Sequence, residues 1–318
     1  MKPRIKLAFC DMWRNFNPQS NYFMRLLAPH FDVQLTDRPD FVIYGCSGHE
    51  HRRHRCTRIF FSGENWRPNF RVCDFAFTFD HHKNPCHYRL PSYGLYGDPH
   101  NLVKRDWNPR QILAQKSVFC NFIYSNPLCA TRNRFFRELS KYKRVESGGK
   151  LYNNIGGRID DKLSLVRKSK FTIAFENESH AGYTTEKLGE PMHAQSLPIY
   201  WGNKQVHLDF NPKSFINTHN WPSLEAAIEH VIAVDRDDEL YCQYLEQPWY
   251  HNNRVNQYVD PANVLARFNE IFLSPPQPIA ISHRVAKVFH LDLLRDVRYS
   301  MTRRIKRSGR KIAYRLAG

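Results

Sequence analysis

The sequence predicts an α/β protein of two domains, each built on a parallel sheet. Its 318 residues, 42% of them hydrophobic, are enough for one large core or for two domains. Short apolar runs of strand length alternate with helical patterns, which is typical of a parallel sheet covered on both faces. One stretch, residues 171–202, contains a complete strand, helix and strand. We therefore expect Rossmann-like domains, whose ligands bind at the carboxyl ends of the strands.

The first half of the chain contains four predicted strands and one predicted helix. The strands lie at residues 6–9, 31–35, 41–45 and 58–62, and the helix lies at residues 22–27. The first strand ends in a polar segment with the pattern DxWxxFxPxxN, from Asp11 to Asn21. The fourth strand runs into Gly63-Glu64-Asn65, which places the Glu64 carboxylate at the carboxyl edge of the predicted sheet.

Residues 46–56, CSGHEHRRHRC, invite comparison with a zinc site because they contain cysteines and histidines. Their spacing matches no common set of zinc ligands, and the arginines among them would repel a cation. A solvated basic helix or loop is the interpretation we favour. The eight cysteines of the chain include no CxxC pair, which favours reduced, buried thiols.

The second half begins after a polar segment with Pro109, residues 106–116, which we predict to be the domain linker. Strands are expected at residues 118–124, 171–175 and 196–200, and helices at 130–139, from Glu186 onward, at 224–232 and at 237–245. The predicted domains are residues 1–110, residues 117–280, and a helical region with a basic tail at residues 281–318.

The segment from the second of these strands, residues 171–175, into its helix carries the strongest sign of a ligand site. Thr184 or Thr185 is placed to cap the helix that begins near Glu186. A helix N-terminus offers free N–H groups and a partial positive charge, which suit a phosphate, and Lys187 adds a full charge there. Arg132 lies near another predicted helix start, close to the same edge of the sheet.

Several motifs closely resemble those of glycosyltransferase family 10, the α-1,3/4-fucosyltransferases. They are FEN at 175–177, GYTTEK at 182–187, PIYWG at 198–202 and NPKSFIN at 211–217. GEN at 63–65, the segment around Arg132 and the early DxWxxFxPxxN pattern resemble the family as well. No apolar run of about 18 residues is present, so the chain looks like the soluble bacterial members.

The resemblance implies the GT-B architecture, two Rossmann-like domains facing across a cleft. The N-terminal half would hold the acceptor and the C-terminal half the nucleotide sugar. The implied activity is that of an inverting α-1,3-fucosyltransferase, which moves L-fucose from GDP-fucose to a hydroxyl, usually O3, of N-acetylglucosamine in a glycan acceptor.

The resemblance and the chemistry of inversion together suggest a role for each candidate residue. Glu64 is the expected general base, and Arg132 and Lys187 would stabilise the departing diphosphate. Glu186 would accept from ribose hydroxyls, and Asn177 and Tyr183 would orient the donor. The roles of Glu176, Glu178 and the pair His81-His82 stay open. No metal and no cofactor are needed in this interpretation.

The net charge of +17 leaves a second class of function open. A basic chain binds anions, and a nucleic-acid-binding protein is the competing interpretation, although it leaves the order of the motifs unexplained. Within the enzyme class, the alternative is a transferase that uses another GDP-sugar donor. Residues 299–318 contain seven Lys or Arg and no acid, so we predict that this tail binds an anionic membrane surface. The expected location is the cytoplasm, peripheral on the inner face of the membrane.

Overall fold

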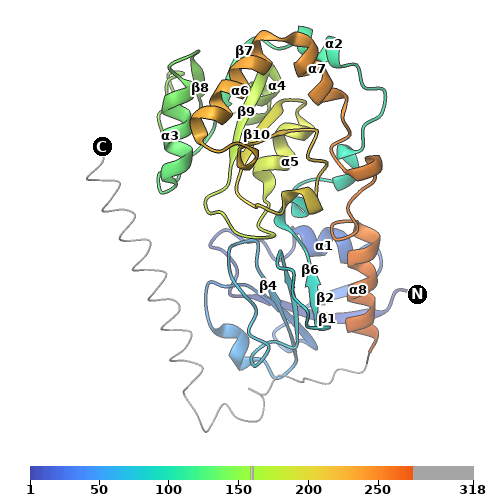
Figure 1. Ribbon diagram of the computed structural model, residues 1–318. Coiled ribbons are helices and arrows are strands. Elements are labelled where there is room, and N and C mark those ends of the chain that lie inside the picture. Colours follow the sequence, from blue (N-terminus) through green and yellow to red (C-terminus); the bar gives the residue numbers. More distant parts are fainter. Residues whose placement is uncertain (158, 160, 275–318) are drawn as a thin grey trace. The chain divides into compact units, whose positions relative to one another are not determined.

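The computed structural model describes residues 1–157, 159 and 161–274 (Figure 1). The described residues form two compact units, residues 1–99 with 257–274, and residues 100–256. Both units are built on a parallel sheet with helices, as the sequence predicts. The predicted region at residues 281–318 lies outside the described residues. None of the described helices is long and apolar enough to cross a membrane.

The sheet of the first unit has six strands, all parallel to their neighbours, in the order β2-β1-β3-β4-β5-β6. The strands are β1 (Arg4–Cys10), β2 (Asp32–Leu35), β3 (Phe41–Tyr44), β4 (Thr57–Phe61), β5 (Phe75–Thr78) and β6 (His87–Arg89), and the α-helices are α1 (Tyr22–Leu27) and α8 (Pro261–Leu273). Every residue of β3 and β4 is buried, which explains the continuous apolar run of β3. Strand β4 begins with two buried polar residues, Thr57 and Arg58, and is apolar after them. Because all six strands run the same way, the segments after β1, β3 and β4 lie at one edge of the sheet.

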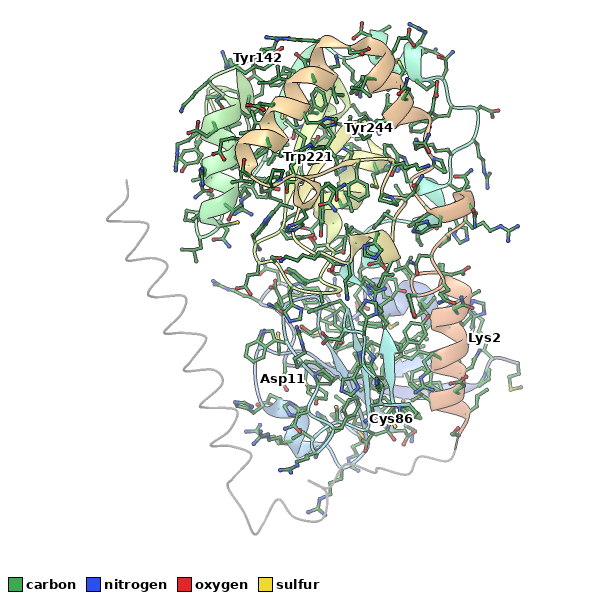
Figure 2. All side chains as sticks on the ribbon, in the orientation of Figure 1. Lys2, Asp11, Cys86, Tyr142, Trp221 and Tyr244 are labelled. Atoms are coloured by element: carbon green, nitrogen blue, oxygen red, sulfur yellow. The ribbon has the colours of Figure 1, made fainter. Side chains whose placement is uncertain are left out.

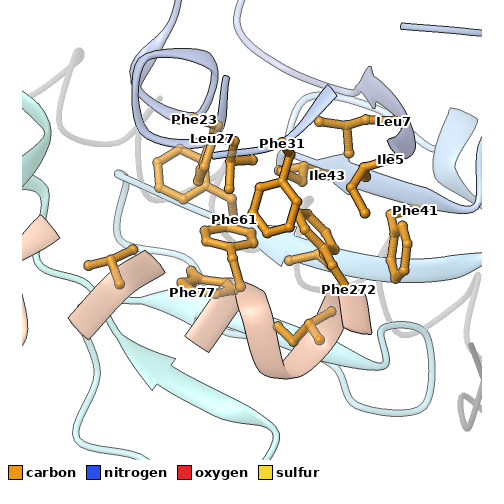
Figure 3. Packing of buried hydrophobic residues seen from close by; sticks show 14 of the residues in the cluster. Ile5, Leu7, Phe23, Leu27, Phe31, Phe41, Ile43, Phe61, Phe77 and Phe272 are labelled. Carbon is orange, nitrogen blue, oxygen red and sulfur yellow. The ribbon is translucent and has the colours of Figure 1, made fainter. Parts of the chain in front are cut away.

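Helix α8 supplies part of the core of the first unit although it is distant in sequence. Phe268 stacks on Phe77 of β5 with ring centroids 4.5 Å apart and packs edge-on against Phe23 of α1. Phe272 packs against Phe41 of β3 in the same cluster (Figure 3). The predicted second domain, residues 117–280, is therefore wrong for this helix, because its apolar face is buried on the first sheet.

The sheet of the second unit has five parallel strands in the order β11-β10-β9-β7-β8. The strands are β7 (Val118–Phe122), β8 (Val145–Ser147), β9 (Ser169–Phe175), β10 (Leu197–Trp201) and β11 (Ile216–Asn217), and the α-helices are α2 (Pro109–Ala114), α3 (Ala130–Leu139), α4 (Lys162–Lys168), α5 (Glu186–His193), α6 (Leu224–Arg236) and α7 (Asp238–Glu246). Strand β9 is buried along its whole length and lies between β10 and β7. The segment that leaves its carboxyl end is therefore at the centre of the sheet edge.

The predicted linker, residues 106–116, is largely helical. The Asn108 side chain accepts a hydrogen bond of 3.1 Å from the backbone N–H of Gln111, and Pro109 occupies the first turn of α2. Proline suits that position because its fixed backbone angle matches the helix and its missing N–H is not needed there. Helix α2 packs against α7 of the second unit, so this segment belongs to that unit.

We predict that Phe268→Ala lowers the free energy of unfolding of the first unit by about 3–5 kcal/mol, the usual cost of removing a buried phenylalanine. Urea denaturation would measure the change. Leu273→Ala is the matched control, because Leu273 ends the same helix and is 61% exposed. Equal effects of the two substitutions would contradict the assignment of α8 to this core.

Candidate active site

Glu64 follows β4 in a tight loop that fixes its backbone and exposes its side chain. The Ser62 hydroxyl donates to the Glu64 carbonyl at 2.9 Å and accepts from the Glu64 N–H at 3.1 Å. The N–H of Trp66 donates to the same carbonyl at 2.6 Å. Glu64 itself is exposed, and among the described residues its carboxylate has no hydrogen bond that would occupy it.

A pocket of about 490 Å³ lies beside Glu64, and we call it the Glu64 pocket. Its walls come from the segments after β1, β3 and β4, from the start of α1, and from Leu95 and Tyr96. The lining residues with charged or exposed aromatic side chains are Asp11, Trp13, Arg25, Glu64 and Tyr96. All lining residues belong to the first unit.

Asp11, which is labelled in Figure 2, lines the Glu64 pocket and holds the segment after β3 in place. Its carboxylate accepts hydrogen bonds from the backbone N–H of Glu50 at 2.9 Å and of His51 at 3.0 Å, and it lies 2.5 Å from His51 Nδ1. Burial raises the pKa of Asp11, but the hydrogen bonds from His51 outweigh burial and hold it below its ordinary value. A Cβ at Gly48 would lie 2.3 Å from the carboxylate, so only glycine permits this approach.

The structure corrects part of the prediction for residues 46–56. His51 is buried rather than solvated, and its ring stacks on Tyr44 at 4.0 Å. Burial is the largest of the effects that lower its pKa. The described residues contain no group of histidine, cysteine and acidic side chains that could hold a metal ion. Sequence reasoning missed the pairing of His51 with Asp11, since the two residues are 40 positions apart.

In the second unit, Glu176 links the end of β9 to the start of α5. The carboxylate of Glu176 is fully buried. One oxygen accepts from the Thr185 N–H at 2.7 Å, and the other accepts from the Thr185 hydroxyl at 2.8 Å. Thr185 is the N-cap of α5. Glu176, which the sequence left without a role, therefore fixes the cap of the helix that carries Glu186 and Lys187.

Lys187 and Glu186 line a pocket at the carboxyl edge of the second sheet, together with Asn177. We call it the Lys187 pocket. The Lys187 ammonium lies 3.0 Å from a Glu186 oxygen and 3.5 Å from a Glu176 oxygen. Burial lowers the pKa of Lys187, but the two carboxylates raise it well above its ordinary value. Burial raises the pKa of Glu186. The charge of Lys187 and the hydrogen bond from its ammonium outweigh burial and hold the pKa of Glu186 below the usual range.

Arg132 lies behind the wall of the Lys187 pocket. It is fully buried in α3, and its guanidinium packs on the Tyr124 ring at 4.0 Å. It donates to the side-chain oxygen of Asn177 at 2.9 Å and to the carbonyl of Asn126 at 2.5 Å. Its Nε–H has no hydrogen-bond partner among the described residues. Arg132 therefore orients two residues that line the pocket and keeps one unused donor.

A further buried residue, Asn203, was not identified from the sequence. Its side chain accepts from the Gly182 N–H at 2.9 Å and donates to the Thr184 hydroxyl at 3.0 Å. Its own N–H donates to the Tyr200 hydroxyl at 2.9 Å. Asn203 thus ties the loop before α5 to the end of β10. The sequence signal that could have identified Asn203 is its position just after the strand predicted at residues 196–200.

The other predicted residues lie outside the two pockets. Tyr183 is buried and does not line the Lys187 pocket, and it makes a small contribution to the raised pKa of Lys187. The exposed pair His81-His82 follows β5, and neither histidine lines the Glu64 pocket. Glu178 lines neither pocket.

We predict that Lys187→Ala lowers the free energy of unfolding by about 3–5 kcal/mol, because it leaves the buried Glu176 carboxylate without a cation. The double variant Glu176→Gln/Lys187→Ala should recover a large part of that loss. Chemical denaturation would measure both. Lys162→Ala is the control, because Lys162 lines the same pocket but forms a partly exposed pair with Glu190, which contributes little. Equal stability of Lys187→Ala and the wild type would refute this account of Glu176.

Solved structures share this fold, in which each of two α/β units is built on a parallel sheet. One, the crystal structure of an α1,3-fucosyltransferase, has a TM-score of 0.75 and 25% sequence identity, and the match covers 86% of this chain and 91% of that one. The crystal structure of an α1,3-fucosyltransferase with GDP-fucose has a TM-score of 0.74 at 24% identity, over 86% and 92% of the two chains. The fold is therefore that of the GT-B glycosyltransferases, two Rossmann-like domains.

Family models identify the group within that class. The model of the α-(1,3)-fucosyltransferase FucT N-terminal domain matches residues 7–96, and the model of the glycosyltransferase family 10 (fucosyltransferase) C-terminal part matches residues 113–269. The chain belongs to glycosyltransferase family 10, the fucosyltransferases.

Curated relatives agree with this family. The α-(1,3)-fucosyltransferase FucT of Helicobacter pylori is 28% identical over 287 residues, which cover 76% of this chain and 60% of the relative. The α-(1,3)-fucosyltransferase 4 of Bos taurus is 30% identical over 208 residues, 64% of this chain and 48% of the relative. The chain thus spans between about half and three fifths of the length of these two relatives.

Proposed function

We propose that this chain is an inverting α-1,3-fucosyltransferase that moves L-fucose from GDP-fucose to a hydroxyl, usually O3, of N-acetylglucosamine in a glycan acceptor. The observation that carries the proposal is the pairing of two unlike sites in one family 10 chain. One site presents an exposed carboxylate, Glu64, and the other presents Lys187 at the start of a helix.

The Lys187 pocket is suited to the donor. Helix α5 begins at Glu186, so the positive end of its dipole lies beside Lys187, where a diphosphate would be stabilised. Glu186 already accepts from Lys187, and a ribose hydroxyl is a second donor that its carboxylate can take. Arg132 acts through Asn177 and Asn126 in this structure and has one N–H left for an anion. Tyr183 stays a proposed donor-binding residue, because it lies in the same motif, GYTTEK, as Lys187.

The proposed reaction is a single displacement. Glu64 takes the proton of the acceptor hydroxyl while that oxygen forms a bond to C1 of fucose. The bond from C1 to the β-phosphate oxygen breaks on the opposite face, which inverts the anomeric carbon. The electron pair leaves with GDP, whose added negative charge Lys187 and Arg132 stabilise.

The alternatives have less support. Another GDP-sugar as donor is not favoured, because the matched family and relatives are described as fucosyltransferases. Nucleic-acid binding rests on net charge and on aromatic residues among basic ones, and it gives no role to the two pockets.

We expect Glu64→Gln to lower turnover by roughly a hundred- to ten-thousand-fold, because glutamine keeps the shape but cannot take the proton. The dissociation constant for GDP-fucose should change little. Glu186→Gln is the contrasting variant and should act mainly by weakening donor binding. Steady-state kinetics and calorimetric titration of both variants separate the roles. Near-normal turnover of Glu64→Gln would transfer the role to another acid or to His81-His82.

We also propose that the reaction needs no metal ion. Lys187 and Arg132 supply the charge that a divalent cation supplies elsewhere. Turnover with and without EDTA should agree, and GDP should bind equally in both. Activity that vanishes with EDTA and returns only with a divalent ion would contradict this proposal.

The basic tail carries a separate proposal from sequence. Residues 299–318 would hold the protein on an anionic surface, the inner face of the cytoplasmic membrane, each cation contributing up to about 1 kcal/mol. Cutting the chain after Tyr299 should abolish salt-sensitive binding to anionic vesicles while turnover of soluble substrates survives. Equal vesicle binding by the truncated protein would disprove it.

A further inference from the structure

We propose that Trp13 and Tyr96 form an aromatic platform that binds the acceptor sugars beyond the one that receives fucose. The inference rests on the proposed function, because it identifies the ligand of the Glu64 pocket. Trp13 and Tyr96 would thereby determine how the enzyme distinguishes an oligosaccharide from a single sugar.

The first support is where exposed aromatic surface occurs. Among the residues that the structure describes, six large apolar side chains are exposed, and only two of them are aromatic. These two are Trp13, 55% exposed, and Tyr96, 61% exposed, and both line the Glu64 pocket. Exposed apolar side chains gathered at one pocket indicate a binding surface, whereas scattered ones need no explanation.

The second support is that the chain holds both residues in place. Trp13 opens a turn in which the Phe16 N–H donates to its carbonyl at 3.0 Å, and the two rings meet edge-on at 4.9 Å. Tyr96 follows the short 3₁₀ helix η2 (Ser92–Leu95). That helix packs beside the Glu64 loop, since a Cβ at Gly63 would lie 3.6 Å from Ser92 and 4.0 Å from Leu95. The platform is therefore built next to the proposed base.

The third support is the charge of the pocket, which selects the kind of ligand. The chain carries a net charge of +17, yet the only charged residues that line this pocket are Asp11, Arg25 and Glu64. The Asp11 carboxylate is already occupied by backbone N–H groups and His51. A site with so little positive charge suits a neutral ligand better than a phosphate or a nucleic acid.

A neutral oligosaccharide has the matching chemistry. The C–H faces of its rings pack on the electron-rich faces of aromatic side chains. Its hydroxyls can pair with the amides and hydroxyls that also line the pocket, including Asn15, Asn17 and Ser47. The volume of about 490 Å³ lies within the range of roughly 300–1,000 Å³ that ligand pockets occupy.

The test compares Trp13→Ala and Tyr96→Ala with the wild type. Acceptors are a panel of neutral N-acetylglucosamine-containing oligosaccharides of three to five sugars, tri-N-acetylchitotriose included, and N-acetylglucosamine itself. Each substitution should raise the KM of the best oligosaccharide roughly two- to tenfold, the range for one aromatic contact. The KM for GDP-fucose and the kcat/KM for the single sugar should stay unchanged. Tyr96→Phe and Trp13→Tyr keep a ring and should restore most of the oligosaccharide KM.

Leu35→Ala is the control, because Leu35 is exposed on the same unit outside the pocket. Saturation-transfer NMR with the same sugars, without donor, gives a binding readout that is independent of turnover. One outcome is that the chain binds an oligosaccharide without transferring fucose to it. If Trp13→Ala weakens that binding, the proposed function is refuted and this inference stands. If the chain transfers fucose but neither alanine variant changes the KM for the oligosaccharide, the inference alone is overturned. Failure of every oligosaccharide in the panel to bind would overturn it as well.

Discussion

The Lys187 pocket depends on one buried carboxylate, that of Glu176. An ion taken out of water costs several kcal/mol unless its hydrogen bonds and charge are satisfied. Thr185 satisfies both oxygens and Lys187 supplies the charge. Gly202 closes the arrangement from the next strand, because its φ is +157° and a Cβ there would lie 2.5 Å from Glu176. The motifs FEN, GYTTEK and PIYWG are therefore separate parts of a single contact.

The Glu64 pocket depends on a similar contact, made by the acid that follows the first strand of its unit. Asp11 has a positive φ of 55° and directs its carboxylate at the N–H groups of residues 50 and 51, as Glu176 directs its own at Thr185. In each unit an acid just after a strand holds a loop in place, and the hydrogen bonds that it accepts there occupy its carboxylate. Glu64 differs, because Ser62 fixes its backbone and leaves its side chain exposed. This difference separates the two acids that hold loops in place from Glu64, the proposed base.

The sequence was most informative where a strand runs directly into polar residues. It predicted the ends of β4 and β9, and with them the pocket positions of Glu64, Asn177, Glu186 and Lys187. It did not predict that Arg132 is enclosed by Tyr124 and Asn177, because burial depends on neighbours distant in the chain.

Two errors have a similar physical origin. The apolar face of α8 would fit either sheet, and only packing against Phe77 and Phe23 decides which. Asn108-Pro109 has the composition of a chain break, yet the same pair is a cap and first turn when a helix has α7 to pack on. The local sequence pattern thus predicts whether a segment is a helix or a strand more readily than it predicts which sheet or helix that segment packs against.

The overall charge of the chain is a poor guide to its sites. Lys187 already has two carboxylates beside it, and Lys162 at the same pocket pairs with Glu190. The contacts of Lys187 suit the proposed role, because a lysine held by Thr185, Glu176 and Glu186 would lose little further side-chain freedom on binding a diphosphate. The carboxylates also keep it protonated by raising its pKa. Such a cation is fixed and charged before the donor binds. It can stabilise the charge that appears on the leaving group without first reorganising, and preorganised groups lower a reaction barrier in this way.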